Sequence, residues 1–195
     1  MPAPDPEKIA RLRTALEDVE TYKGDFFDRP REEALAPIRA RALGLLDQRA
    51  RSRSELRDRL CAAEFAPQLV DDVLDGLERS GLIDDTAFAR EWVRQRAAHR
   101  GKAAAALDNE LKQKGVAAQA RQEALAQLTR EDEEAAARHI AEKKVNTIRQ
   151  RPADRAEYDK LLRRVVGMLA RRGYDSALSL RTARDALNAR LRDVE

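Results

Sequence analysis

The sequence is poor in the residues on which most small catalytic and cofactor sites depend. Its 195 residues include two histidines, one cysteine and one tryptophan, and aromatic residues make up only 4%. A single cysteine excludes an intramolecular disulfide and is typical of proteins from a reducing compartment. We interpret Cys61, which follows Leu60 within an apolar pattern, as a small buried hydrophobe rather than a nucleophile.

Long apolar runs are also missing. No stretch approaches the roughly 20 apolar residues that cross a bilayer as a helix. The N-terminal MPAPDPEKIARLR lacks the apolar core of a signal peptide. The sequence therefore predicts a cytoplasmic protein without a membrane partner.

No group of residues has the spacing of a catalytic or metal site. His99 and His139 are far apart in the chain, and neither has a cysteine or histidine at metal-ligand spacing. The pair Gly101-Lys102 ends like a phosphate-binding loop, but the earlier glycine and the following Ser or Thr are absent. We expect a non-enzymatic protein with no metal and no cofactor.

Helix-forming residues dominate what remains. Charged residues make up 37% of the chain, and Ala, Leu, Arg and Glu are abundant whereas β-branched residues are few. This composition favours helices over strands. The predicted fold class is all-α.

One apolar spacing occurs three times and predicts a repeated helical unit. The three occurrences are Leu56-Leu60-Phe65, Leu107-Leu111-Val116 and Val165-Leu169-Tyr174. The first two are offset by 51 residues and the last two by 58. A second amphipathic run follows each: Val70, Val73, Leu74 and Leu77; Ala124, Leu125 and Leu128; Leu180, Ala183 and Leu187. Such units bury their apolar faces only by stacking, so we predict three tandem three-helix repeats in an elongated curved array with a flexible N-terminal arm.

Capping residues and glycines place the boundaries of these units. We predict an N-terminal arm over 1–33, partly disordered or a short helix, and repeats over 34–81, 82–128 and 129–195. The predicted helix starts are Pro37, Ser52 with Glu55, Pro67, Asp84 or Asp85, Thr129 with Asp132, Asp154 with Glu157, and Ser176. The predicted stops include Gly81, Gly101, Gly115 and Gly173, and we expect the first helix of the third repeat to reach Gln150.

The arm carries two features of its own. Ile9, Leu12, Leu16 and Val19 fit one face of a short helix. Phe26 and Phe27 either form a docking spot or pack back onto the first repeat.

Charge alternates in blocks along the chain, although the net charge is only +3. Arginines dominate the segments 39–59 and 90–102, and acidic residues dominate the segment 71–85 between them. This pattern suits a partner that carries both signs, or a nucleic acid on one face. Basic helix surfaces also keep helices soluble, so the charge pattern alone does not decide between these interpretations.

Three motifs resemble a known family. They are SRSELRDRL at 52–60, GLIDDTAFAREWVRQR at 81–96, and the two helix endings ELKQKGV and MLARRGY. Together they resemble RecX, the bacterial regulator of the RecA recombinase, over about Ala34 to Leu191. The segment joining the first two repeats is the most specific part of this likeness.

The resemblance implies a modular helical fold and a function. It implies binding to RecA–DNA filaments, with inhibition of ATP hydrolysis, strand exchange and co-protease activity, and binding to single- and double-stranded DNA. The positions that match are Arg94, Arg96, Arg100, Lys102, Arg171 and Arg172. We expect replacement of Arg94, Arg96 and Lys102 by glutamate to keep the helicity and abolish inhibition.

Two other classes stay open, and both share the helical repeats. One is a DNA-binding protein without sequence preference that ignores RecA. The other is a scaffold for a different protein, bound through the acidic face. A monomer is the default for an array with polar ends.

Overall fold

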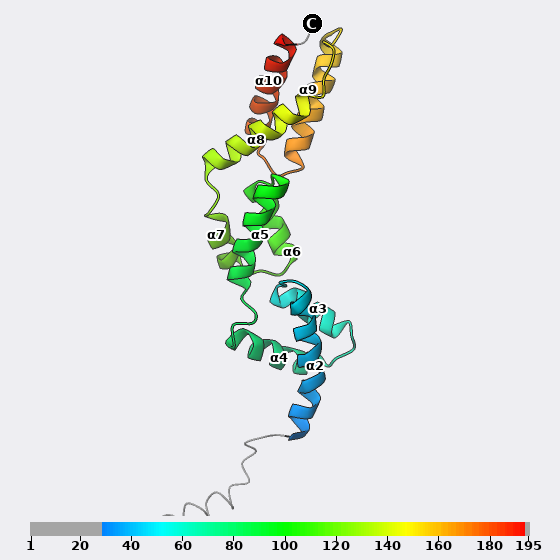
Figure 1. Cartoon of the computed structure of the whole chain (residues 1–195), viewed down its shortest axis with the longest axis vertical. Coiled ribbons are helices and arrows are strands. Elements are labelled where there is room, and N and C mark those ends of the chain that lie inside the picture. The colour runs from blue at the N-terminus through cyan, green and yellow to red at the C-terminus, as the bar shows by residue number, and fades with distance from the viewer. Residues whose placement is uncertain (1–28, 194–195) are drawn as a thin grey trace, which may run out of the picture. The chain divides into compact units, whose positions relative to one another are not determined.

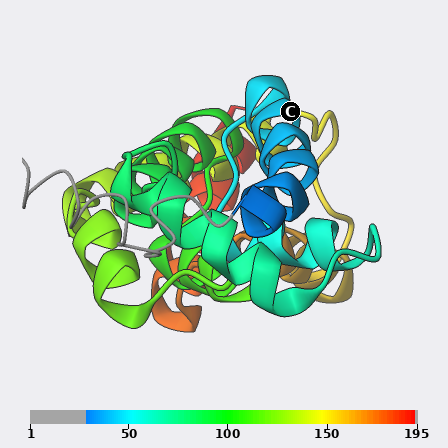
Figure 2. The ribbon, with the colours of Figure 1, turned by 90° about the horizontal axis from the view of Figure 1, so that it is seen from below.

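The structure is a computed structural model that describes residues 29–193, and every regular element in this range is an α-helix (Figures 1 and 2). The helices are α2 (Arg29–Gln48), α3 (Arg53–Cys61), α4 (Pro67–Arg79), α5 (Asp85–Arg100), α6 (Ala104–Gln113), α7 (Ala118–Leu125), α8 (Arg130–Val145), α9 (Arg155–Ala170) and α10 (Ser176–Arg192). The predicted all-α class is confirmed. The expected helix around Leu12 and the Phe26–Phe27 pair lie outside the described residues.

Helices α3 to α10 pack in the predicted groups. Helix α3 packs on α4, α7 packs on both α5 and α6, and α10 packs on both α8 and α9. The chain divides between Pro37 and Ile38, and the second unit, Ile38–Glu195, holds all of the contacts between helices described below. The tandem three-helix repeats are confirmed, whereas their exact borders and the elongated, curved arrangement stay predictions. In the described part of the chain, no helix has both the length and the apolar character needed to span a bilayer.

The repeated apolar spacing forms the core of each repeat. Leu56, Leu60, Leu107, Leu111, Val116, Val165, Leu169 and Tyr174 are buried, and Phe65 is half-buried. One expected core residue is wrong, because Leu180 is 41% exposed. The buried face of α10 carries Ser179, Thr182, Ala183, Ala186 and Leu187 instead.

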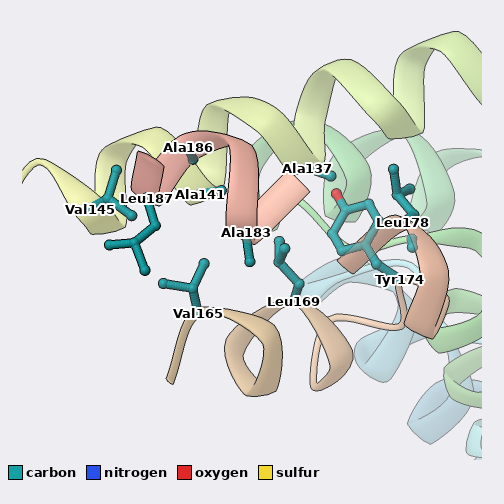
Figure 3. Close-up of a cluster of buried hydrophobic side chains, with 11 residues drawn as sticks. Ala137, Ala141, Val145, Val165, Leu169, Tyr174, Leu178, Ala183, Ala186 and Leu187 are labelled. Carbon is teal, nitrogen blue, oxygen red and sulfur yellow. The ribbon is translucent and has the colours of Figure 1, made fainter. Parts of the chain in front are cut away.

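The core of the third repeat is made by side chains from all three of its helices. Figure 3 shows Val165 and Leu169 of α9 pointing toward Ala183 and Leu187 of α10. The small side chains of Ala137 and Ala141 let α8 approach the same cluster closely. Tyr174 closes one end of it, and its hydroxyl donates a hydrogen bond to the carbonyl of Gly101 at 3.1 Å.

The predicted caps are confirmed where hydroxyl and carboxylate side chains begin helices. Ser52 and Glu55 form a capping box, as do Thr129 and Asp132. Asp84 caps α5, and Asp154 caps α9 by accepting the backbone N–H of Glu157. The four predicted glycine stops all have positive φ, from 54° to 92°.

Three predicted helix limits are wrong. Helix α2 begins at Arg29 and continues through Pro37, because strong helix formers precede the proline. The predicted third helix of the second repeat, from about Ala117 to Leu128, is α7, which ends at Leu125, and the Gln127 side chain beyond it donates to the carbonyls of Arg90 and Ala124. Helix α8 ends at Val145 rather than Gln150, and the Thr147 hydroxyl donates to the carbonyl of Lys144.

Candidate nucleic-acid interface at the repeat junctions

The first and second repeats meet at the N-terminal end of α3. The Ser52 hydroxyl donates to the backbone carbonyl of Lys114 at 2.6 Å. The backbone N–H of Arg53 donates to the Asp85 carboxylate at 2.8 Å. A backbone carbonyl and a carboxylate of the second repeat therefore accept hydrogen bonds from the N-terminal end of α3 in the first repeat. Burial at this contact raises the pKa of Asp85 above its ordinary value.

The second and third repeats meet in the same way at the N-terminal end of α6. The backbone N–H of Ala103 donates to the carbonyl of Arg172 at 2.9 Å, and that of Ala104 donates to Glu133 at 2.7 Å. Ala103 lies 51 residues after Ser52, and Arg172 lies 58 residues after Lys114. The two sequence offsets thus relate the Ser52–Lys114 contact of one junction to the Ala103–Arg172 contact of the other, whereas Glu133 does not stand at either offset from Asp85.

Glycine is required where a turn of one repeat approaches a helix of the preceding repeat. A Cβ atom on Gly115 would lie 2.3 Å from the Cβ of Ser54, and one on Gly173 would lie 2.6 Å from the Cβ of Ala106. Both glycines also have positive φ, of 71° and 92°. Close packing therefore holds each junction together in addition to its hydrogen bonds.

Glu55 gathers the cations of the first junction. Its carboxylate accepts from Arg49 at 3.0 Å and from Lys114 at 2.8 Å. Burial alone would raise the pKa of Glu55, but the hydrogen bonds from Arg49 and Lys114 outweigh it and lower the pKa to about 2. Both cations thus share one carboxylate partner within the protein.

Glu110 gathers further cations inside the second repeat. It accepts hydrogen bonds from Lys102 and from the indole N–H of Trp92, the latter at 2.9 Å. Arg96 approaches it to 4.0 Å and lies 4.1 Å from the centre of the Trp92 ring. Burial opposes ionisation of Glu110, yet the hydrogen bonds from Lys102 and Trp92 lower its pKa. Two of the six predicted site residues, Arg96 and Lys102, are therefore held by a neighbouring carboxylate.

The remaining predicted residues differ in their surroundings. Arg94 is 68% exposed and pairs with Glu91 on its own helix at 2.6 Å. Arg171 is exposed at the end of α9. Arg100 and Arg172 come together in the lining of one pocket of about 390 Å³ between α5, α8 and α9.

This pocket, which we call the junction pocket, is strongly basic. Its polar lining includes His99, Arg100, His139, Lys143, Lys144 and Arg172, and no carboxylate of residues 29–193 lines it. Ile140 and Met168 add apolar surface. The two histidines, interpreted from the sequence as unrelated surface residues, are exposed and line the same pocket. No group of three or more metal-ligating side chains occurs in residues 29–193.

Sequence reasoning missed Lys143 and Lys144 and the two carboxylates Glu55 and Glu110. The lysines lie in the last turn of α8, far in sequence from the arginine-rich segments. A comparison of the repeats at their offsets of 51 and 58 would have found the carboxylates, because Ala106 and Met168 stand at the equivalent positions.

Comparisons with known proteins agree with this architecture. Family models for the first and second three-helix domains of RecX match residues 39–77 and 84–125. The chain is 52% identical over 192 residues to "Regulatory protein RecX" of Corynebacterium efficiens, covering 96% of this chain and 91% of that protein. It is 40% identical over 166 residues to the protein of the same name from Streptomyces lividans, covering 85% and 86%.

Solved structures show the same fold. A crystal structure of regulatory protein RecX aligns with a TM-score of 0.66 at 24% identity, covering 94% of this chain and 79% of that one. The structure of RecX from Lactobacillus salivarius aligns with a TM-score of 0.67 at 20% identity, covering 80% and 98%. With its three-helix repeats, their two equivalent junctions and these relatives, the chain belongs to the RecX family of regulatory proteins.

Proposed function

We propose that this protein binds RecA–DNA filaments and lowers RecA activity without catalysing a reaction. The observation that carries the proposal is the 52% identity, over nearly the whole chain, to a protein named "Regulatory protein RecX". RecA ATP hydrolysis, strand exchange and co-protease activity would all fall, because each depends on an intact filament. The protein would act as a cytoplasmic monomer.

The repeat architecture supports a mechanical mode of action. Three linked modules can contact several subunits of a polymer at once, and linkage raises the effective concentration of each further contact. Binding that favours one arrangement of the RecA subunits shifts the filament toward that arrangement. If that arrangement hydrolyses ATP slowly, or if it blocks growth at an end, activity falls with no covalent step.

A DNA-binding protein that is indifferent to RecA is the second candidate. The junction pocket favours it, since four permanent cations line a site without a carboxylate. Such a protein would bind DNA equally well with or without RecA. It would leave RecA ATP hydrolysis unchanged at concentrations that do not displace RecA from DNA.

A titration separates the candidates. The protein is added to RecA, single-stranded DNA and ATP while ATP hydrolysis is followed, and its binding to the same DNA alone is measured by fluorescence anisotropy. A filament regulator lowers hydrolysis at concentrations below those that saturate free DNA. Unchanged hydrolysis with tight DNA binding supports the second candidate, and failure of both measurements supports a scaffold for another partner.

A further inference from the structure

The two repeat junctions share a backbone arrangement but differ in charge. In the first junction, Glu55 stands at the third position of α3 and binds Arg49 and Lys114. In the second junction, the third position of α6 is Ala106. Arg100 and Arg172 stand where Arg49 and Lys114 stand in the first junction, at the offsets of 51 and 58. The second junction therefore keeps the two cations and lacks their carboxylate.

The third repeat also lacks a carboxylate at the position equivalent to Glu110. Glu110, which binds Lys102 and Trp92, is replaced after 58 residues by Met168. Met168 lines the junction pocket. In the described part of the chain, Arg100, Lys143, Lys144 and Arg172 form no ion pair with a carboxylate. The cations of this pocket are thus available to an anion from outside the chain.

Stabilisation of helix C-termini by basic residues is a simpler explanation for these cations, but the partial charge at the helix ends is smaller than the charge of the cations. Helices α5, α8 and α9 end at Arg100, Val145 and Ala170, and basic residues are stabilising at such ends. Each helix C-terminus is equivalent to roughly −0.5 of an elementary charge. Three ends together contribute about −1.5 elementary charges, whereas four positive charges line the pocket. A positive excess remains even before the two histidines are counted.

We propose that the junction pocket binds a phosphate group of single-stranded nucleic acid. Arginine forks and lysine ammonium groups that converge without a carboxylate suit a phosphate, which accepts several charge-assisted hydrogen bonds. A pocket of about 390 Å³ with Ile140 and Met168 in its lining also has room for part of a nucleotide. A nucleotide of a single strand can leave its stack and enter such a hollow, whereas the backbone of a duplex stays on a convex surface. The inference deepens the proposed function and rests on it, because it names where DNA is held.

The test uses the full chain and a fluorescent oligothymidylate. Arg100→Gln with Arg172→Gln removes two cations and is expected to weaken binding about tenfold at 0.1 M salt. The slope of log affinity against log salt is expected to fall by roughly 0.7, because the one phosphate held in the pocket is no longer neutralised. The matched control Arg59→Gln with Arg184→Gln removes the same charge from exposed positions on α3 and α10. It is expected to leave the affinity within about twofold, because neither residue lines the pocket.

A second pair of variants tests the missing carboxylate. Met168→Glu puts back the charge that Glu110 supplies in the second repeat, and Met168→Gln has the same size without the charge. We expect the glutamate variant to bind the oligonucleotide about tenfold more weakly than the glutamine variant. Thermal unfolding of both variants shows whether either has lost the fold. If Met168→Glu is unfolded, the affinity of the variant Arg100→Gln with Arg172→Gln, compared with its matched control, decides whether the pocket binds the oligonucleotide.

Three results would overturn the inference. The first is equal affinity of the arginine pair and its matched control for the oligonucleotide. The second is binding of a duplex or of free ATP with the same affinity and the same dependence on Arg100 and Arg172. The third is an equal response to polyglutamate, which would assign the pocket to an acidic protein. RecA ATP hydrolysis is recorded separately, so unchanged DNA binding by the arginine pair together with intact inhibition by the unmodified chain contradicts the pocket alone, and absent inhibition by the unmodified chain contradicts the proposed function.

Discussion

The Ser52 hydroxyl donates a hydrogen bond to the carbonyl of Lys114 at 2.6 Å, across 62 residues of sequence. The same oxygen accepts the backbone N–H of Glu55 at 3.1 Å and so caps α3. One fully buried side chain therefore begins a helix and fastens it to the next repeat. In the second junction, the backbone N–H of Ala103 donates the equivalent hydrogen bond to the carbonyl of Arg172. No side-chain hydroxyl is therefore required at this position.

Ser52→Ala is expected to destabilise the protein by about 1–3 kcal/mol, because it removes a cap and leaves the Lys114 carbonyl without this donor. Chemical denaturation followed by circular dichroism measures the loss. Ser80→Ala is the matched control, since the Ser80 hydroxyl bonds only the Leu77 carbonyl on its own helix. Equal losses for the two variants would mean that the contact between repeats contributes nothing.

Gly173→Ala is expected to destabilise the protein more than Gly81→Ala. Both glycines have positive φ, of 92° and 74°, and alanine there costs about 1–2 kcal/mol. A Cβ on Gly173 would also meet Ala106 at 2.6 Å, whereas one on Gly81 would have nothing within 4 Å. The difference between the two melting temperatures therefore reports the close approach at the second junction. Identical melting temperatures would show that the close approach of Gly173 to Ala106 of α6 does not contribute to stability.

The ion pairs of Glu55 predict a dependence of stability on pH. Its folded pKa of about 2 lies below the ordinary value of 4.5, so folding favours the ionised form. The stabilisation is complete above pH 4.5 and is lost as the pH falls toward 2. It is at most about 3 kcal/mol, and less because part of the carboxylate is exposed.

Glu55→Gln is accordingly expected to lower the urea midpoint at pH 7 and to match the unmodified chain near pH 2. Asp71→Asn is the control, since Asp71 pairs with Arg57 at an exposed position where solvent screens the interaction. A gap between Glu55→Gln and the unmodified chain that stays constant with pH would contradict the assignment.

Charge reversal is expected to divide the arginine and lysine residues into two groups. Arg96→Glu with Lys102→Glu places two new carboxylates beside Glu110 and Trp92, so unfolding at lower temperature and altered fluorescence of the single tryptophan are expected. The expectation that reversal of Arg96 and Lys102 would keep the helicity does not follow from these contacts. Arg100→Glu with Arg172→Glu leaves Trp92 and its partners in place, so the melting temperature and the tryptophan emission stay near those of the unmodified chain. The reverse order of stability would contradict the roles assigned to Glu110 and to the junction pocket.

The cores and caps of the repeats could be predicted because they depend on local order in the sequence. The spacing of Leu107, Leu111 and Val116 places them on one helical side, and Ser52 with Glu55 begins a helix by a contact within four residues. Leu180 escaped the same reasoning, because packing against α8 and α9 selects which side of α10 is buried.

The charge partners could not be predicted from local order. No local motif indicates that Glu110, eight residues after Lys102, holds this lysine, and nothing near Arg100 indicates that Lys144 lines the same pocket. Folding brings Lys102 to Glu110 within the second repeat, and it brings Arg100 and Lys144 of different repeats to one pocket. Only the internal comparisons of Glu55 with Ala106 and of Glu110 with Met168 carry the information in the sequence itself.

Sedimentation of RecA filaments tests the proposed regulation as a physical association. The chain is mixed with RecA, single-stranded DNA and a nucleotide that keeps the filament assembled, and the pellet is compared with those from RecA alone and DNA alone. We expect the chain to pellet with the complete filament well beyond the sum of the two separate controls. A pellet no larger than that sum would contradict filament recognition and leave only the binding of DNA.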